Sequence, residues 1–157
     1  MLRVQSATSM REVGLIRDLF IEYAGSLGFD LSFQNFQKEL DELPGDYSPP
    51  NGRLLLGFHD SDPVGCVALR EISEEICEMK RLYVCPRCRG LGLGKRLATK
   101  VIADAREIGY RKMRLDTVPA MRAAITLYVS LGFKEIEPYR YNPIEGTKFM
   151  ELDLAKE

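Results

Sequence analysis

The sequence predicts a mixed α/β domain in which helices cover a sheet. Apolar residues alternate with polar ones in some segments and recur at the helical spacing in others, and the two kinds of segment follow one another along the chain. A glycine-rich stretch over residues 89–95 separates a strand-like run from a helix-like one. The predicted order of elements is β-α-α-β-β-β-α-β-α-β-β.

The first third of the chain predicts one strand, two helices and a loop. Residues 2–7 have the pattern of a strand, and Thr8 or Ser9 can cap a helix over residues 10–26. Residues 33–43 predict a second helix. The segment that follows is rich in Pro, Gly and polar residues, which is typical of a loop.

The rest of the chain alternates between strands and helices. A Pro-containing turn joins the first two of these strands, and Gly109 ends the long helix. The predicted strands span residues 53–59, 64–71, 76–84, 112–117, 133–137 and 149–154. The predicted helices span residues 93–108 and 120–130.

The glycine-rich stretch has the features of an anion site. The first amides of a helix have no partner inside the helix, and the helix dipole makes that end positive, so a phosphate or pyrophosphate fits there. No Asp or Glu falls between Glu78 and Asp104, although the whole chain has a net charge of −1. Basic residues surround the stretch: Lys80, Arg81, Arg87, Arg89, Lys95, Arg96 and Lys100. The predicted ligand is therefore a polyanion.

The spacing of the glycines excludes two nucleotide-binding motifs. A dinucleotide fingerprint requires G-x-G-x-x-G, but Gly90, Gly92 and Gly94 alternate, so the third glycine comes one residue early. A P-loop requires G-x-x-x-x-G-K-[ST], but Arg89 stands in place of its first glycine and Arg96 in place of its Ser or Thr.

Two motifs resemble the GCN5-related N-acetyltransferase (GNAT) family. Its acetyl-CoA loop, Q/R-x-x-G-x-G/A, is matched by Arg89-x-x-Gly92-x-Gly94, after the lead-in Leu82-Tyr83-Val84-x-Pro86. Its second signature is similar to Leu127-Tyr128-x-x-Leu131-Gly132-Phe133. The resemblance is clearest over residues 54–133.

The resemblance implies the acyl-CoA N-acyltransferase (GNAT) fold and direct transfer of an acetyl group from acetyl-CoA to a primary amine. In that fold the fourth and fifth strands splay apart, the pantetheine arm lies in the gap, and the pyrophosphate binds the loop. The implied cofactor-binding residues are Leu82, Tyr83, Val84, Arg89, Gly90, Leu91, Gly92, Leu93, Gly94 and Lys95. The alternative is a non-catalytic module of the same fold that binds acyl-CoA.

The resemblance also implies catalytic roles. Tyr128 matches the tyrosine that acts as general acid toward the CoA sulfur, whereas a packing role is the alternative. The oxyanion is expected to meet a backbone N–H of the fourth strand, that of Val84 or a neighbour. Met121 stands where many members carry an asparagine that holds the pantetheine arm, so cofactor contacts in that segment are expected to differ.

Glu78 is the candidate general base. It lies eleven positions before Arg89, where histone-modifying members of the family carry their carboxylate. Strand alternation predicts that Glu78 shares a face with Lys80, Leu82 and Val84. A surface acid or an ion pair with Lys80 is the alternative. Other candidate bases are Glu71, Glu75 and His59.

The acceptor stays open at this point, as either a small molecule or a protein amine. Acidic residues in the first two predicted helices suit a cationic amine, whereas Arg17, Arg53 and Arg140 suit a carboxylate. Neither set dominates. Aromatic residues near both ends, Tyr139 and Tyr141 among them, suit either a pocket or ordinary packing.

Length and composition favour one globular domain over residues 1–157, with 45% apolar and 29% charged residues. No apolar run suits a membrane span, and the N-terminal residues lack a signal-peptide pattern, so we expect a cytoplasmic protein. The basic residues are local and the pI is about 6.0, which argues against a nucleic-acid partner. A homodimer is left open.

The four cysteines are expected to be thiols without a metal. Cys85 and Cys88 form a C-x-x-C, but there is no second such pair, and His59 is the only histidine. A redox pair is the alternative, and the glycine loop that separates the pair from the predicted helix argues against it.

Overall fold

The predicted order of elements is confirmed in the computed structural model of the chain, which describes residues 1–28, 30–32 and 35–155. The strands are β1 (Leu2–Ser6), β2 (Arg53–His59), β3 (Asp62–Glu71), β4 (Ile76–Val84), β5 (Lys112–Thr117), β6 (Lys134–Ile136) and β7 (Lys148–Asp153). The helices are α1 (Met10–Ser26), α2 (Phe36–Glu42), α3 (Leu93–Ile108) and α4 (Arg122–Ser130), with short 3-10 helices η2 (Gly45–Tyr47) and η3 (Pro86–Cys88).

Most predicted bounds agree with the structure to within two residues. The last helix, α4, begins at Arg122 rather than at residue 120, and β3 begins at Asp62, two residues earlier than predicted. The start predicted for the second helix, Phe33, lies outside the described residues. In the part of the chain that the structure describes, no helix has the length and apolar character that a bilayer span needs.

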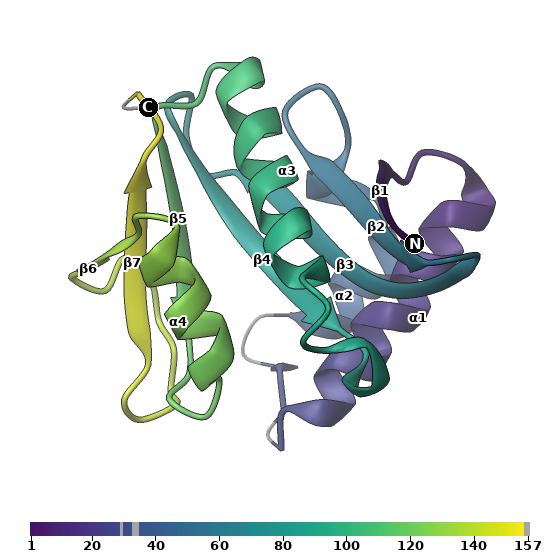
Figure 1. Cartoon of the computed structure of the whole chain (residues 1–157). Helices are drawn as coiled ribbons and strands as arrows, with labels where there is room; N and C mark the ends of the chain where they lie inside the picture. Colours follow the sequence, from purple (N-terminus) through teal and green to yellow (C-terminus); the bar gives the residue numbers. More distant parts are fainter. Residues whose placement is uncertain (29, 33–34, 156–157) are drawn as a thin grey trace.

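The seven strands form one mixed sheet in the order β1-β2-β3-β4-β5-β7-β6. All neighbouring pairs are antiparallel except β4 and β5, which run parallel. Helices α3 and α4 cover one face of the sheet, and α1 and α2 cover the other (Figure 1). Apolar side chains from both faces form the core, which is centred on β2, β3 and β4.

The ends of the two long helices follow from their sequence. At the start of α1, Ser9 and Glu12 form a capping box: the Ser9 hydroxyl accepts the Glu12 amide at 3.1 Å, and the Glu12 carboxylate accepts the Ser9 amide at 3.0 Å. Ser9 rather than Thr8 is therefore the cap. The predicted end of α3 at Gly109 is confirmed, because this residue has a φ of 113°, which favours glycine.

Strands β4 and β5 splay apart, as the family resemblance implied. They pair only from Ile76 with Lys112 to Glu78 with Arg114. Beyond Glu78 the two strands diverge, and α4 lies on the side of β5 (Figure 1). The edge of β4 that faces β5 therefore has no partner strand in the described residues after Glu78.

A β-bulge at Arg81 interrupts β4. The ladder pairs Lys80 with Ala68 and Tyr83 with Cys66, so two residues of β4 oppose a single residue of β3. Arg81 has a φ of 61°, an uncommon conformation for a residue other than glycine. A bulge adds one residue to one strand, and it therefore shifts the alternation of side chains beyond it.

This bulge corrects the predicted distribution of side chains along β4. Val84 faces α3, where a Cβ at Gly94 would lie 3.8 Å from its Cγ2. Lys80 instead lines a cavity beside α2 together with Glu39. The prediction that Val84 shares a face with Glu78 and Lys80 is therefore wrong, because strict alternation does not continue through the bulge.

Candidate active site

The loop before α3 presents unused backbone amides. The first amide to bond back into the helix is that of Arg96, which donates to the carbonyl of Gly92 at 3.1 Å. Among the described residues, no amide from residue 90 to residue 95 donates a hydrogen bond to another group. Gly90 and Gly92 adopt φ values of 85° and 90°, which brings these amides together at the helix start. The result is a concentration of donors suited to an anion.

Arg89 joins this loop to the end of β4. Its Nε donates to the carbonyl of Val84 at 3.0 Å, and its guanidinium lies 5.8 Å from the centre of the Tyr83 ring. The Arg89 side chain therefore fixes the loop against the strand while it also lines the adjacent cavity.

A cavity of about 430 Å³ extends from this loop between β4 and α4. Of the ten residues predicted to bind a cofactor, Leu91 and Lys95 are the two that do not line it; Leu91 is exposed and Lys95 lines a groove along α3. The predicted residues that line the cavity are Leu82, Tyr83, Val84, Arg89, Gly90, Gly92, Leu93 and Gly94. The loop and the free edge of β4 thus form one continuous surface.

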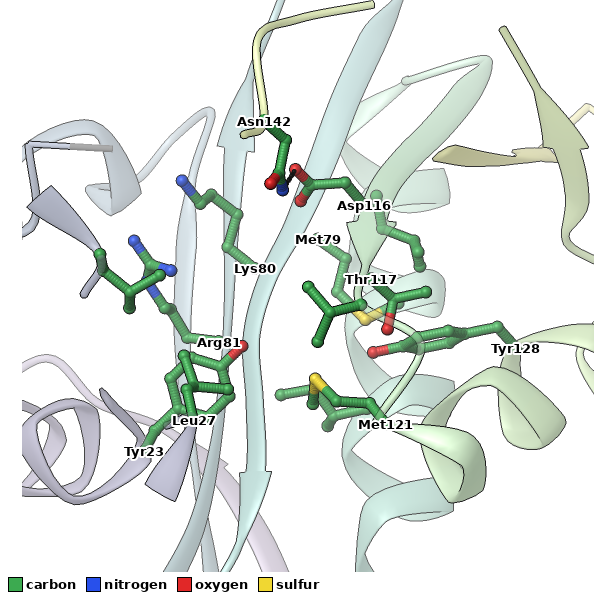
Figure 2. A pocket seen from close by; sticks show the side chains of 14 residues that line it. Tyr23, Leu27, Met79, Lys80, Arg81, Asp116, Thr117, Met121, Tyr128 and Asn142 are labelled. Carbon is green, nitrogen blue, oxygen red and sulfur yellow. Dashed lines mark hydrogen bonds between the residues drawn. The ribbon is translucent and has the colours of Figure 1, made fainter. Parts of the chain in front are cut away.

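Tyr128 lines a second cavity, which adjoins the first where Leu82, Val118 and Met121 line both. Figure 2 shows the hydroxyl of Tyr128 pointing into this space from α4, with the Tyr23 ring on the opposite wall. Tyr128 is only 6% exposed, and its ring packs on Phe133. Its hydroxyl makes no hydrogen bond to a described residue and is not fully buried. Burial raises the pKa of Tyr128, so its hydroxyl stays protonated near neutral pH and can donate.

Two further residues of this cavity bear on ligand binding. Met121, where many GNAT members carry asparagine, precedes α4 without a side-chain cap and lies at the junction of the two cavities. The hydroxyl of Thr117 is buried and has no hydrogen-bond partner among the described residues. A buried polar atom of this kind is normally met by a ligand or by water.

Glu78 is fully buried and its two oxygens are both engaged. Oε1 accepts from Nε of Arg70 at 2.8 Å, and Oε2 accepts from the hydroxyl of Tyr139 at 2.6 Å and lies 3.3 Å from Nη2 of Arg140. Glu78 lines neither of the two cavities described above. These contacts favour a structural role for its carboxylate. The other candidate bases, Glu71, Glu75 and His59, line neither of these cavities and are exposed or nearly so.

A third cavity, of about 280 Å³, lies beside α2 and contains a charged cluster that the sequence did not predict. Lys80 lines both this cavity and that of Tyr128. Arg140 was considered from the sequence as a carboxylate ligand, and it binds Asp116 through contacts of 2.8 and 3.2 Å. Arg70, which also lines this cavity, lies on β3 opposite Glu78, and the fourth cation of the wall, Lys38, is exposed. No local motif connects these residues, which come from three separate segments.

The C-x-x-C lies at η3, where both thiols are buried. The Cys85 thiol donates to Glu22 at 3.0 Å, and burial together with this carboxylate raises the Cys85 pKa to about 11. Redox-active cysteines have lowered pKa values, so this environment does not favour redox function. Among residues 1–28, 30–32 and 35–155, no group of three or more His, Cys, Asp and Glu side chains is arranged to hold a metal ion.

Comparison with known proteins identifies the family of this chain. The family model of the acetyltransferase (GNAT) family matches residues 16–133. An uncharacterized N-acetyltransferase of Schizosaccharomyces pombe is 42% identical over 137 residues, which cover 86% of this chain and 84% of the relative.

Two solved structures share the fold. An acetyltransferase from Streptococcus agalactiae matches with a TM-score of 0.79 at 20% identity, over 97% of this chain and 98% of that one. A GNAT family acetyltransferase from Elizabethkingia anophelis, solved with acetyl-CoA bound, matches with a TM-score of 0.70 at 20% identity, over 97% of each chain. From the span of the family match and the identity to the yeast relative, we conclude that this chain belongs to the acetyltransferase (GNAT) family.

Proposed function

We propose that this protein transfers an acetyl group directly from acetyl-CoA to a primary amine. The observation that carries the proposal is the continuous cavity between β4 and α4, which has unpaired amides at one end and adjoins the Tyr128 cavity. The acetyl-CoA bound in the Elizabethkingia anophelis structure, which shares the fold, supports the same cosubstrate here.

The cosubstrate is held mainly by backbone groups. The amides of residues 90–95 bind the pyrophosphate, where the dipole of α3 adds to their effect. The pantetheine arm lies along Leu82, Tyr83 and Val84, because β5 leaves that edge of β4 unpaired. An extended chain that joins a free strand edge gains main-chain hydrogen bonds without requiring particular side chains.

Transfer requires one bond to form and one to break. The amine nitrogen attacks the thioester carbonyl carbon, and the carbon–sulfur bond then breaks as the thiolate leaves. Tyr128 donates its hydroxyl proton to the thiolate, a role supported by the direction of its hydroxyl into the cavity (Figure 2). A β4 amide close to Val84 stabilises the oxyanion.

The amine must lose a proton in this reaction. The base role predicted for Glu78 stays a prediction, and the contacts of its carboxylate with Arg70, Tyr139 and Arg140 do not support it. Loss of the proton to solvent needs no dedicated side chain.

Release of free thiol tests the proposed activity. The protein is incubated with acetyl-CoA and a panel of primary amines, and thiol is measured with a chromogenic disulfide against a control without amine. Amine-dependent release, with the acetylated amine found by mass spectrometry, is the expected result. Tight binding of acetyl-CoA with no release for any amine would favour a non-catalytic acyl-CoA-binding module instead.

A further inference from the structure

We infer that the acceptor is a small primary amine that also carries a carboxylate, and that Arg70, Lys80 and Arg140 bind this carboxylate in the cavity beside α2. The inference rests on the proposed function, because it concerns the second substrate of the same reaction. It follows from the position of the cavity, from unused hydrogen-bond donors on its wall and from the balance of charge around it.

The cavity beside α2 is placed to receive an acceptor. Lys80 lines both this cavity and the one that contains Tyr128, so a molecule bound by Lys80 lies next to the site of transfer. Figure 2, which draws the Tyr128 cavity, shows the Lys80 side chain pointing away from Tyr128. A volume of about 280 Å³ suits a molecule of amino-acid size. The amine of such a molecule reaches toward Tyr128 when its other end is held at Lys80.

The wall of this cavity offers donors that the protein itself does not use. Arg70 donates only through Nε, to Glu78, which leaves its two terminal nitrogens without a partner among the described residues. Arg140 donates through Nε and Nη2, to Asp116, which leaves Nη1. Lys80 makes no hydrogen bond or ion pair with a described residue. None of these nitrogens is fully buried, and all three residues line the cavity. Together they match the several lone pairs of a carboxylate.

The charged groups around this cavity, apart from the solvated ones at its rim, include one more cation than carboxylates. Glu39 binds Arg81 through two contacts of 2.9 and 3.0 Å. Four cations therefore face three carboxylates: Arg70, Lys80, Arg81 and Arg140 against Glu39, Glu78 and Asp116. The remaining charged lining residues, Lys38, Glu42 and Asp46, are exposed at the rim and well solvated. Lys80 is the cation in excess.

The surroundings of Lys80 disfavour the charged form of its side chain. Burial is the main cause that lowers its pKa from an ordinary value of 10.5 to about 7, and the nearby Arg81 adds to the effect. A partly buried ammonium without a counter-ion is unfavourable, and a ligand carboxylate removes that cost by pairing with it. A cationic acceptor such as a polyamine would instead add a charge of the same sign beside Lys80.

Matched pairs of amines test the inference. L-Alanine, β-alanine, L-aspartate and L-glutamate are compared with their amides, and spermidine serves as a cationic amine, with thiol release as the readout. We expect kcat/KM to be at least about tenfold higher for the acid of an accepted pair, since hydrogen bonds to a charged group are lost in its amide. Equal use of acid and amide, or use of spermidine alone, would overturn the inference.

Binding of CoA to the wild-type protein separates this inference from the proposed function. Calorimetry that detects no CoA binding would count against the proposed function itself. CoA binding without turnover of any carboxylate-bearing amine would leave that function standing and contradict the inference.

Variants of Lys80 test the residue assignment. For an accepted acid, Lys80→Met should raise KM by roughly tenfold or more and remove the preference for acid over amide, with little change in kcat or CoA affinity. Lys80→Arg should keep the preference. Lys134→Met, which removes an equal charge from an exposed position on β6, should change none of these values. A fall in kcat at unchanged KM, or an unchanged preference in Lys80→Met, would contradict the assignment.

Discussion

The hydroxyl of Tyr139 donates a 2.6 Å hydrogen bond to Oε2 of Glu78, at the last position where β4 pairs with β5. The segment between β6 and β7 is thereby attached to β4 at the point where the two strands part. Arg70 and Arg140 bind the same carboxylate from β3 and from that segment. This cluster lies where the two strands part, and the cavities proposed for the cosubstrate and for the acceptor are both lined by residues of β4 beyond Glu78.

Glu78→Gln should lower stability more than it lowers the chemical rate. The substitution removes the carboxylate that Arg70 and Arg140 share, although Arg140 keeps Asp116, and we expect a loss of about 2 kcal/mol in the free energy of unfolding. For a domain of this size, that loss lowers Tm by roughly 4–8 °C. Calorimetric melting measures it, with the exposed Glu75→Gln as control. An unchanged Tm together with loss of kcat and of its low-pH limb would establish Glu78 as the base.

Tyr128→Phe should lower kcat and leave binding intact. The ring and its packing on Phe133 stay, whereas the proton donor is lost. A thiol with a pKa of about 8.5 is already a fair leaving group, so we expect a fall toward the lower end of the general-acid range, on the order of 10²-fold. Acetyl-CoA affinity and Tm should change little. Tyr141→Phe, at an exposed ring, is the control. An unaltered kcat, measured where chemistry limits turnover, would make Tyr128 a packing residue.

The double variant Cys85→Ser, Cys88→Ser should keep transferase activity. Serine can still donate to Glu22, and no metal-binding group is present among the described residues. We expect a modest loss of Tm from burial of a more polar side chain and an unchanged zinc content. Metal analysis and the thiol-release assay measure the outcome. Joint loss of activity and of one bound zinc per chain would show that the pair is a metal site.

The stability of Lys80→Met relative to wild type should depend on pH. The folded pKa of Lys80, about 7, lies below the ordinary 10.5, so folding releases its proton between these values. The penalty for its charge is complete below about pH 7 and fades as pH rises toward about 10. The methionine variant should therefore melt above wild type at about pH 6, and the gap should narrow by about pH 9. A constant gap would contradict the lowered pKa.

The other titratable groups around Lys80 do not produce this dependence of stability on pH. Burial raises the pKa values of the neighbouring tyrosines, and the arginines stay charged throughout that range. Ion pairing with Arg81 and Arg140 lowers the pKa values of Glu39 and Asp116. The titratable and charged groups that face Lys80 are Glu39, Glu78, Asp116, Arg70, Arg81, Arg140, Tyr23, Tyr47, Tyr128 and Tyr139.

The side of the site proposed for the cosubstrate follows from local sequence, whereas the side proposed for the acceptor does not. The loop at Gly92 and the position of Tyr128 are set by motifs whose backbone conformation depends on near neighbours. The bulge at Arg81 depends on pairing with β3, and no glycine marks its positive φ. Arg140 reaches Glu78 only through tertiary packing of an irregular segment. Sequence periodicity therefore could not reveal the cationic cavity.

Titration calorimetry of acetyl-CoA with wild type, Gly94→Asp and Gly94→Asn tests the central claim most directly. Gly94 has ordinary backbone angles and room for a side chain, so both variants should fold. Gly92 is a poorer choice, because a side chain at its φ of 90° would strain the backbone. An acid in the first turn favours the helix, so the Tm of Gly94→Asp should not fall. We predict that wild type binds, that Gly94→Asp loses binding by about a hundredfold or more, and that Gly94→Asn loses much less. Equal affinity in wild type and Gly94→Asp would contradict binding of the pyrophosphate at the start of α3.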